Sequence, residues 1–319
     1  MAIVKPRFFN QISVTEKDDI KILKKSSNDK KLLDEIAWYK KVPDKAKKYV
    51  PNIYASGTED STNWVEMEFI NSKTVHELYI KKEMTVQEYK AFYANITKVL
   101  EELQSNCSKT KKNKNTFFND RYQMYVSKTL ERLSTLAQEQ IFFPFFTNDI
   151  TINKKSYPNL LTILSLVLKK VKKLLLTDDT FTFIHGDLHF SNIMYNPTSQ
   201  EIKIFDPRGK FGSNQELGDS IYEWAKLTHS VHGKYDLITE SLFDLKIKDT
   251  TIDYKFIEDS AYTDKVYKTF LQFVPKEKKK QVLLCECLLF FSMIPLHSDN
   301  YEWQIMMLCR TIELFYEIK

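Results

Sequence analysis

The sequence predicts an α+β protein of two parts, a small mixed lobe over residues 1–72 and a mainly helical lobe over residues 73–319. Three observations predict this fold class. Short β-like runs and one helical run alternate before residue 72, whereas apolar residues recur at helical spacing over most of the chain beyond it. The length of 319 residues is also about twice the ~150 residues of a typical domain, so the chain can bury a sizeable core.

The small lobe is expected to begin with a hairpin. The runs Phe8–Ser13 and Ile20–Lys25 are β-like and are separated by polar residues typical of a turn. A helix is expected over about Lys31–Lys41, because capping residues precede it and a proline follows it. A further strand at Trp64–Ile70 completes the lobe.

The large lobe is expected to consist of amphipathic helices and one compact β-rich segment. This segment comprises the apolar runs Phe181–Ile184, Ile193–Tyr195 and Ile202–Phe205. Beyond residue 210 the periodicity predicts an almost wholly helical chain. The expected helices are Val86–Gln104, Arg121–Gln138, Leu160–Leu176, Gln215–Ser230, Tyr262–Phe273, Lys278–Ile294 and Tyr301–Ile318.

Composition and charge exclude several classes of protein. A net charge of +5 and a pI near 8.7 are too mild for a dedicated nucleic-acid binder. The four cysteines form no CxxC pair, so we expect free thiols in a reducing compartment. The longest apolar run, Leu283–Leu296, is shorter than the ~20 residues of a membrane span and contains Glu286. It predicts a buried core helix in a cytoplasmic protein.

Glycine usage excludes three phosphate-binding or catalytic motifs. The chain has 6 glycines, and only Gly57 precedes residue 185. No GxxxxGK[ST], GxGxxG or GxSxG sequence occurs, so Walker and Rossmann phosphate loops and the hydrolase nucleophile elbow are absent from the sequence.

Oxygen-bearing side chains gather around the β-rich segment. Asp187 and Asn192 lie in the sequence His-Gly-Asp-Leu-His-Phe-Ser-Asn, and Asp206 follows the apolar run at Ile202–Phe205. Two carboxylates and an amide at such positions suit a hard cation such as Mg²⁺. If Asn192 and Asp206 hold the metal, Asp187 remains available to a hydroxyl group.

This spacing resembles the H-R-D-x-x-x-x-N loop and the D-F-G aspartate of protein kinases, with Gly186 in place of the arginine and D-P-R-G in place of D-F-G. At these residues the chain is similar to the aminoglycoside phosphotransferase and choline kinase family, which has H-G-D-x-x-x-x-N. The resemblance is strongest over Phe181–Lys226 and points to the D-P-R-G branch associated with bacterial surface-polysaccharide loci. It implies a bilobal protein-kinase-like fold whose N-terminal lobe, residues 1–72, binds the nucleotide.

The resemblance also implies roles for individual residues. Asp187 would be the catalytic base, and Asn192 and Asp206 would be the Mg²⁺ ligands. His185 would support the loop, and Ser191 is a weaker candidate for a contact with phosphate or with the loop.

Two further residues near this motif are candidates for supporting roles. Arg208 either contacts phosphate or substrate, or forms a structural ion pair with Asp219 or Glu216. Asp219 resembles the family's acid that braces the metal-binding loop.

The small lobe carries a second match to the family. In that family, a lysine on a strand contacts the nucleotide phosphates and pairs with a glutamate on a helix. Alternation along the strand favours Lys24 over Lys25 for the lysine, and Glu35 is its expected partner. The backbone of Glu68 and Ile70 falls where the family binds the adenine edge. The departure is the glycine-rich loop, since no glycine precedes Gly57.

The resemblance implies a kinase that uses ATP and Mg²⁺ to phosphorylate a hydroxyl group of a small metabolite, namely a sugar, a polyol or an amino alcohol. A choline-like amine would need a cage, which Trp224, Tyr301, Glu302 and Trp303 are candidates to form. One alternative is a catalytically silent nucleotide-binding module, favoured by the missing glycine loop. The other is a non-haem iron oxygenase with His185, Asp187 and either His229 or His232 as ligands.

Overall fold

The structure is a computed structural model that describes residues 11–17, 20–105, 114–176 and 180–318. Its contacts divide the chain into two compact units. The first unit combines residues 1–108 with residues 181–218, and the second combines residues 109–180 with residues 219–319. The β-rich segment therefore belongs with the N-terminal sheet, and the lobe boundary at residue 72 stays a prediction.

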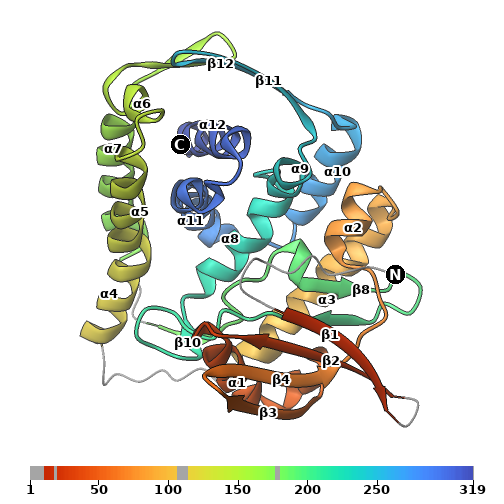
Figure 1. The fold of residues 1–319 in the computed structure, drawn as a ribbon. Coiled ribbons are helices and arrows are strands. Elements are labelled where there is room, and N and C mark those ends of the chain that lie inside the picture. Colours follow the sequence, from red (N-terminus) through yellow and green to blue (C-terminus); the bar gives the residue numbers. More distant parts are fainter. Residues whose placement is uncertain (1–10, 18–19, 106–113, 177–179, 319) are drawn as a thin grey trace. The chain divides into compact units, whose positions relative to one another are not determined.

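An antiparallel sheet of four strands dominates the first unit (Figure 1). Its order is β1-β2-β4-β3, with β1 at Gln11–Lys17, β2 at Ile20–Ser27, β3 at Ile53–Glu59 and β4 at Thr62–Glu68. The predicted hairpin is β1–β2, in register from Gln11 opposite Ser26 to Lys17 opposite Ile20. The part of the prediction before residue 11 lies outside the described residues. Helix α1, at Lys31–Lys41 as expected, follows β2 directly.

Two helices of the first unit begin with the same sequence signature. Helix α2 (Val75–Ile80) follows Thr74, and helix α3 (Val86–Gln104) follows Thr85. In each case the threonine hydroxyl accepts a hydrogen bond from the amide three residues on, and the glutamate at that position binds back to the threonine amide. Such capping boxes satisfy amides that a helix start leaves unpaired. Helix α3 thereby begins at the expected residue.

Short strand pairs hold the segments that carry the candidate site. Strand β7 (Thr182–Phe183) pairs with β10 (Leu217–Gly218), and β8 (Ile193–Tyr195) pairs with β9 (Ile202–Ile204). A short 3-10 turn at Phe190–Asn192 leads into β8. The loop between β7 and β8 therefore has both ends fixed by strand pairing.

The second unit is mainly helical, with helix α11 packed against α5, α7, α8 and α12 (Figure 1). The helices of this unit are α4 (Lys114–Tyr122), α5 (Lys128–Ala137), α6 (Phe143–Thr147), α7 (Leu160–Leu174), α8 (Ser220–Val231), α9 (Tyr235–Thr239), α10 (Ser260–Phe270), α11 (Lys279–Met293) and α12 (Tyr301–Glu317). A π-helical turn at Gln123–Ser127 joins α4 to α5, where the sequence predicts one continuous helix.

The expectation of an almost wholly helical chain beyond residue 210 is wrong. Strands β11 (Phe243–Lys248) and β12 (Thr251–Phe256) form a hairpin, and β12 pairs in parallel with β5 (Ile150–Ile152), which in turn pairs with β6 (Lys155–Tyr157). Polar and apolar residues alternate along β11. This alternation is typical of a strand, and the helical prediction did not take it into account.

Helix α11 forms the centre of the second unit, which confirms the predicted core helix. Its buried residues lie on all of its faces, as expected for a helix that is apolar all round. By length and composition the segment Lys276–His297 is apolar enough to cross a membrane, but 67% of it is buried among the described residues. Cys285, Cys287 and Cys309 are buried free thiols, as predicted, and Cys107 lies outside the described residues.

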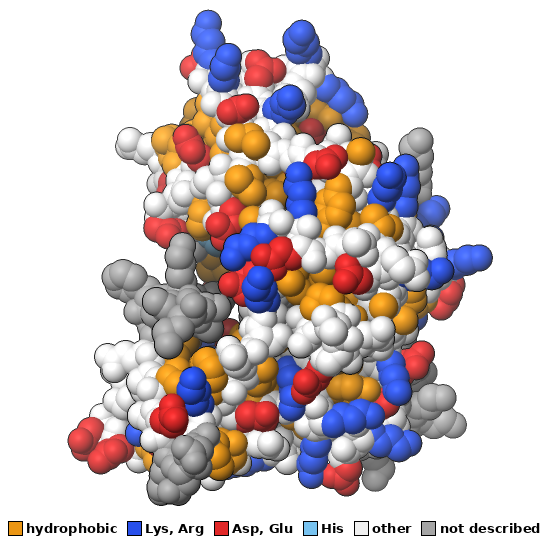
Figure 2. Space-filling model, turned by 90° about the vertical axis from the view of Figure 1, so that its right-hand side faces the viewer, with side chains coloured by type: hydrophobic (Ala, Val, Ile, Leu, Met, Phe, Trp, Pro, Cys, Tyr) orange, Lys and Arg blue, Asp and Glu red, His pale blue; other side chains and the backbone are white. Residues whose placement is uncertain are grey.

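Charged side chains of both signs are interspersed over the face of the molecule drawn in Figure 2. This distribution matches a net charge of +5 that arises from 47 basic and 42 acidic residues.

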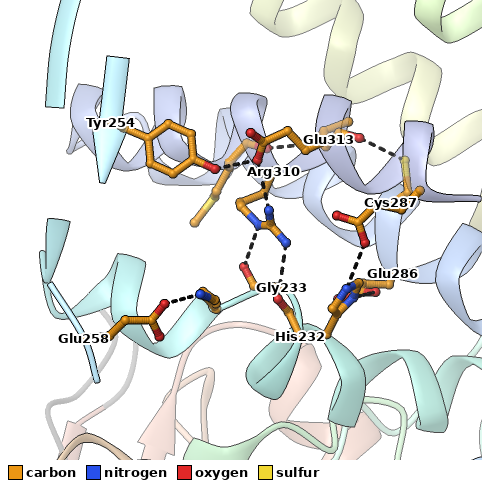
Figure 3. Close-up of polar contacts among 12 residues, drawn as sticks. His232, Gly233, Tyr254, Glu258, Glu286, Cys287, Arg310 and Glu313 are labelled. Atoms are coloured by element: carbon orange, nitrogen blue, oxygen red, sulfur yellow. Dashed lines mark hydrogen bonds and ion pairs between the residues drawn. The ribbon is translucent and has the colours of Figure 1, made fainter. Parts of the chain in front are cut away.

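A buried polar network ties the end of α8 to α11 and α12 (Figure 3). His232 pairs with Glu286 through Nδ1 at 2.9 Å and with Glu317 through Nε2 at 3.0 Å, and its ring stacks on Tyr267. The guanidinium of Arg310 donates to the carbonyl oxygens of His232 and Gly233 and pairs with Glu313. Burial lowers the pKa of His232, but Glu286 and Glu317 outweigh burial and Arg310, so that the pKa rises from 6.5 to about 9.

This raised pKa predicts a pH dependence of stability. The stabilisation from His232 is fully present below pH 6.5 and is lost as the pH rises through about 9. The shift corresponds to about 3 kcal/mol at most. We therefore expect His232→Gln to lower the free energy of unfolding far more near pH 6.5 than near pH 9, as measured by urea denaturation. His76→Gln, a partly exposed histidine of α2, is the control, and an equal loss at both pH values would contradict the assignment.

Candidate functional site

The loop between β7 and β8 is held in shape by its own hydrogen bonds. The carbonyl oxygen of Asp187 accepts from the amide of His189 at 2.9 Å and from Nδ2 of Asn192 at 2.8 Å. Asn192 is 5% exposed, and its Oδ1 has no hydrogen-bond partner among the described residues. The hydrogen bond from Nδ2 to Asp187 thus orients the side-chain amide of Asn192, and Oδ1 is available as a ligand.

His185 makes hydrogen bonds to this loop and to the segment before Asp206. Its ring is fully buried, Nε2 lies 3.0 Å from the carbonyl oxygen of Phe205, and Nδ1 accepts from the amide of Asp187 at 3.3 Å. Burial lowers the pKa of His185 to about 4, against the opposing effects of Asp187, the Phe205 carbonyl and Asp206. The ring is therefore neutral, with its proton on Nε2. Both nitrogens are engaged, which leaves none for an iron atom.

Asp206 is brought to the same loop by the end of β9. The amide of Phe205 donates to the carbonyl oxygen of Asn192 at 3.1 Å, and the amide of Asp206 donates to the hydroxyl of Tyr39 at 3.2 Å. Asp206 has a positive φ of 59°, an uncommon conformation that these contacts maintain. The structure thus brings together the two predicted segments, the Asp187–Asn192 loop and Asp206.

The lysine in this arrangement is Lys25, and the preference for Lys24 is wrong. Lys25 Nζ lies 2.6 Å from Glu35 and 2.5 Å from Asp206, and its side chain is 9% exposed. Lys24 lies on the opposite face of β2, where it pairs with Glu66 at 3.6 Å. Alternation along β2 correctly places the two lysines on opposite faces of the strand. The face that carries Lys24 with Ile20 and Ile22 is, however, the more exposed of the two.

These ion pairs shift the titration of the groups involved. Burial lowers the pKa of Lys25, but the charges of Glu35 and Asp206 outweigh this effect and hold the pKa above its ordinary value. Burial and the nearby Asp206 raise the pKa of Glu35, and the ammonium group of Lys25 opposes them. Lys25 therefore stays positively charged across the physiological pH range.

Helix α1 fixes the site through three residues on one of its faces, Glu35, Trp38 and Tyr39. Residues three and four positions apart share a face of a helix. Glu35 binds Lys25, the indole of Trp38 donates to the carbonyl oxygen of Ile184 at 2.7 Å, and Tyr39 accepts from Asp206. The sequence showed the aromatic pair after Glu35, but gave no signal of which backbone groups it binds.

The remaining candidate residues of the first unit lie at other points of the chain, namely Glu68, Ile70, Ser191 and Arg208. The Glu68 amide donates to Asn52, so an adenine edge would use the Glu68 carbonyl oxygen and the Ile70 amide. Ser191 lies in the short turn before β8. Arg208 follows Asp206 and donates through Nε to the Lys210 carbonyl oxygen at 3.0 Å.

Asp219 belongs to the second unit and directly precedes helix α8. Its carboxylate caps α8 by accepting from the Ile221 amide, pairs with Arg121 at 2.9 Å and accepts from the Tyr125 hydroxyl. Within the first unit, Glu216 pairs with Lys41 at 2.9 Å and not with Arg208, so the ion pair of Arg208 with Glu216 is not formed among the described residues of that unit.

The arrangement combines two accessible carboxylates with a buried cation. The side chains of Asp187 and Asp206 are 22% and 38% exposed, whereas Lys25 and Glu35 are almost enclosed. With the Asn192 oxygen, this set of oxygen donors is of the kind that a hard cation prefers. Asp187 lies beside that donor set, where a carboxylate can accept a proton from a hydroxyl group.

Comparison with known proteins agrees with this geometry. The sequence matches the phosphotransferase enzyme family over residues 14–206, more than half of the chain. No curated protein matches the sequence significantly. The fold is similar to that of a thermostable mutant of aminoglycoside phosphotransferase APH(4)-Ia in its apo form, with a TM-score of 0.64, 9% identity, and coverage of 98% of this chain and 93% of that chain.

Two ligand complexes are similar in fold as well. A ternary complex of a thermostable APH(4)-Ia mutant with AMP-PNP and hygromycin B has a TM-score of 0.62 at 8% identity, and covers 98% of this chain and 92% of that chain. The GDP complex of wild-type aminoglycoside 2'-phosphotransferase-IIIa has a TM-score of 0.58 at 13% identity, with 98% and 91% covered. These likenesses confirm the kinase-like α+β fold. Because the family match runs from β1 through the Lys25 strand to Asp206, and the fold agrees, the chain belongs to the phosphotransferase enzyme family.

Proposed function

We propose that this protein transfers the γ-phosphoryl group of ATP to a hydroxyl group of a small metabolite. The observation that carries the proposal is that Asp206 binds the Lys25–Glu35 pair, while the residue before Asp206 is hydrogen-bonded to the Asp187–Asn192 loop. Family membership supports the phosphoryl transfer, and the AMP-PNP complex of a protein with this fold supports a nucleotide donor.

The residues fit a magnesium ion, which would be held by the Asn192 Oδ1 and the Asp206 carboxylate. An ion held there would supply positive charge that neutralises the phosphates of the nucleotide. Lys25 would contact the nucleotide phosphates, and Glu35 holds its ammonium group in position. Asp187 would orient the acceptor hydroxyl and take its proton. Catalysis would then rest on positioning and electrostatic stabilisation.

A sugar or polyol is the acceptor class that we favour, in line with the D-P-R-G sequence and a cytoplasmic enzyme that acts in surface-polysaccharide synthesis. An aromatic cage for a choline-like amine is not supported. Trp224 packs on Phe270, Tyr301 packs on Phe142, and the Trp303 indole donates to a serine hydroxyl. Each of these aromatic side chains thus has a partner outside the expected cage.

A catalytically silent module is the second candidate, because β1 and β2 are joined without a glycine. A scan of acceptors with γ-labelled ATP distinguishes the two functions, with sugars, polyols, amino alcohols and nucleotide-linked precursors as probes. Phosphorylation of one acceptor class supports the enzyme. Nucleotide binding without any transfer supports the silent module.

Asp187→Asn is expected to lower kcat by at least about 10²-fold, because it removes the base and keeps the size of the side chain. The affinity for ATP and the melting temperature should change little. Steady-state kinetics with the acceptor found in the scan, together with a thermal melt, measure both effects. Turnover within a few-fold of wild type in a folded variant would remove Asp187 from the catalytic role.

Lys25→Ala is expected to raise KM for ATP or lower turnover by about tenfold or more, whereas Lys24→Ala should change neither. Both variants lose one positive charge from the same strand, so Lys24 is the matched control. Removing Lys25 alone leaves Glu35 buried and unpaired, which costs about 3–5 kcal/mol. The double variant Lys25→Met with Glu35→Gln removes both charges and shows whether the kinetic loss persists in a folded protein. Equal kinetics for the Lys24 and Lys25 variants would contradict the assignment.

Asp206→Ala is expected to weaken binding of Mg·ATP more than Asp187→Asn does. The first change removes a metal ligand, and the second leaves the nucleotide site intact. Titration calorimetry of both variants with Mg·ATP measures the difference. Equal losses of affinity would contradict the assignment of Asp206 as a metal ligand and Asp187 as the base.

A further inference from the structure

Arg208 carries a guanidinium group that no carboxylate neutralises among the described residues. Its one side-chain hydrogen bond there runs from Nε to the Lys210 carbonyl oxygen. The nearby acid Glu216 pairs with Lys41 instead, at 2.9 Å. Both Nη groups are therefore without a hydrogen-bond partner in this part of the chain, although an arginine can donate five hydrogen bonds.

The stem of Arg208 lies on the backbone of the Asp187 loop. A Cβ atom added to Gly186 would lie 2.9 Å from Cβ and 3.4 Å from Cδ of Arg208. The Arg208 amide also donates to the carbonyl oxygen of His185 at 2.9 Å. A side chain at position 186 would displace Arg208, so the glycine of His-Gly-Asp makes room for this arginine directly beside Asp187.

The next residue fixes the segment from its other side. A Cβ atom at Gly209 would lie 2.4 Å from the backbone of Asp34 in α1, and the φ of Gly209 is +74°. Only glycine combines this approach with this conformation at low cost. The backbone around Arg208 is thus held by the His185 loop and by α1, and Nε of the guanidinium group is held by the Lys210 carbonyl oxygen.

A phosphoryl group in transfer would meet mainly carboxylates at this site. Asp187 and Asp206 present carboxylates, and Lys25 is already shared between Glu35 and Asp206. The connection between β1 and β2 has no glycine with which to wrap backbone amides around the terminal phosphate. A phosphoryl group in transfer carries negative charge on three oxygens, which a guanidinium fork matches in geometry.

We propose that Arg208 binds the oxygens of the γ-phosphoryl group during its transfer, and thereby supplies charge that a glycine-rich loop does not supply here. This inference rests on the proposed function. Arg208 is then a catalytic residue that acts mainly on the transition state, so its loss affects kcat more than KM for ATP.

The test compares Arg208→Met with Lys210→Met. Each change removes one positive charge and keeps an unbranched stem, and the Arg208 variant retains the stem that covers Gly186. The affinity for Mg·ADP is measured by calorimetry with and without aluminium fluoride, which mimics the phosphoryl group in transfer. The rate of ATP hydrolysis by water gives kcat and KM without a known acceptor.

Aluminium fluoride should tighten ADP binding in the wild type and in Lys210→Met. In Arg208→Met we expect at least about tenfold less tightening, with unchanged affinity for ADP alone, and a kcat lower by about 10²-fold or more. Arg208→Lys should restore only part of the loss, because a lysine cannot bind two oxygens in one plane. Full tightening and an unchanged kcat in a folded Arg208→Met variant would overturn the inference. A wild-type protein that binds no ADP would instead overturn the proposed function, and this inference with it.

Discussion

The ion pairs of Lys25 with Glu35 and Asp206 connect three segments of the first unit that are remote in sequence. One ammonium group joins strand β2, helix α1 and the end of strand β9. Removing either partner from a buried ion pair typically costs several kcal/mol, because the remaining charge has no solvent. The pair with Glu35 therefore ties the sheet to α1, whereas Asp206 is the more accessible member of this group.

Helix α1 extends this connection to the loop of Asp187. Glu35 binds the strand lysine, Trp38 binds the backbone of Ile184 before the Asp187 loop, and Tyr39 binds the backbone of Asp206. Gly209 packs against the backbone of the same helix. A rotation of α1 would disturb all of these contacts together. The geometry of the proposed phosphate and metal ligands thus depends on one helix of eleven residues that supplies none of these ligands itself.

The sequence predicted the local parts of the site better than its long-range contacts. Asp187, Asn192 and Asp206 could be grouped because they flank short apolar strands at a spacing that a known loop explains. The choice between Lys24 and Lys25 failed, because alternation along a strand separates two faces but does not say which face is covered. Strand β11 was missed although its residues alternate, since its partner β12 and the parallel neighbour β5 lie in different parts of the chain. The role of Trp38 depends on Ile184, which is 146 residues away in the sequence.

The composition of the first unit from two separate stretches, residues 1–108 and 181–218, has a consequence for synthesis on the ribosome. The N-terminal sheet, α1 and α3 leave the exit tunnel while the strands β7 to β10 have not yet been translated. Until then Glu35 and Lys25 lack Asp206, and Trp38 lacks its acceptor at Ile184. Domains generally fold as units during translation. Here the nascent chain must hold an unfinished sheet with an uncovered tryptophan while residues 109–180 are added, and this unit closes only when the segment ending at Gly218 emerges.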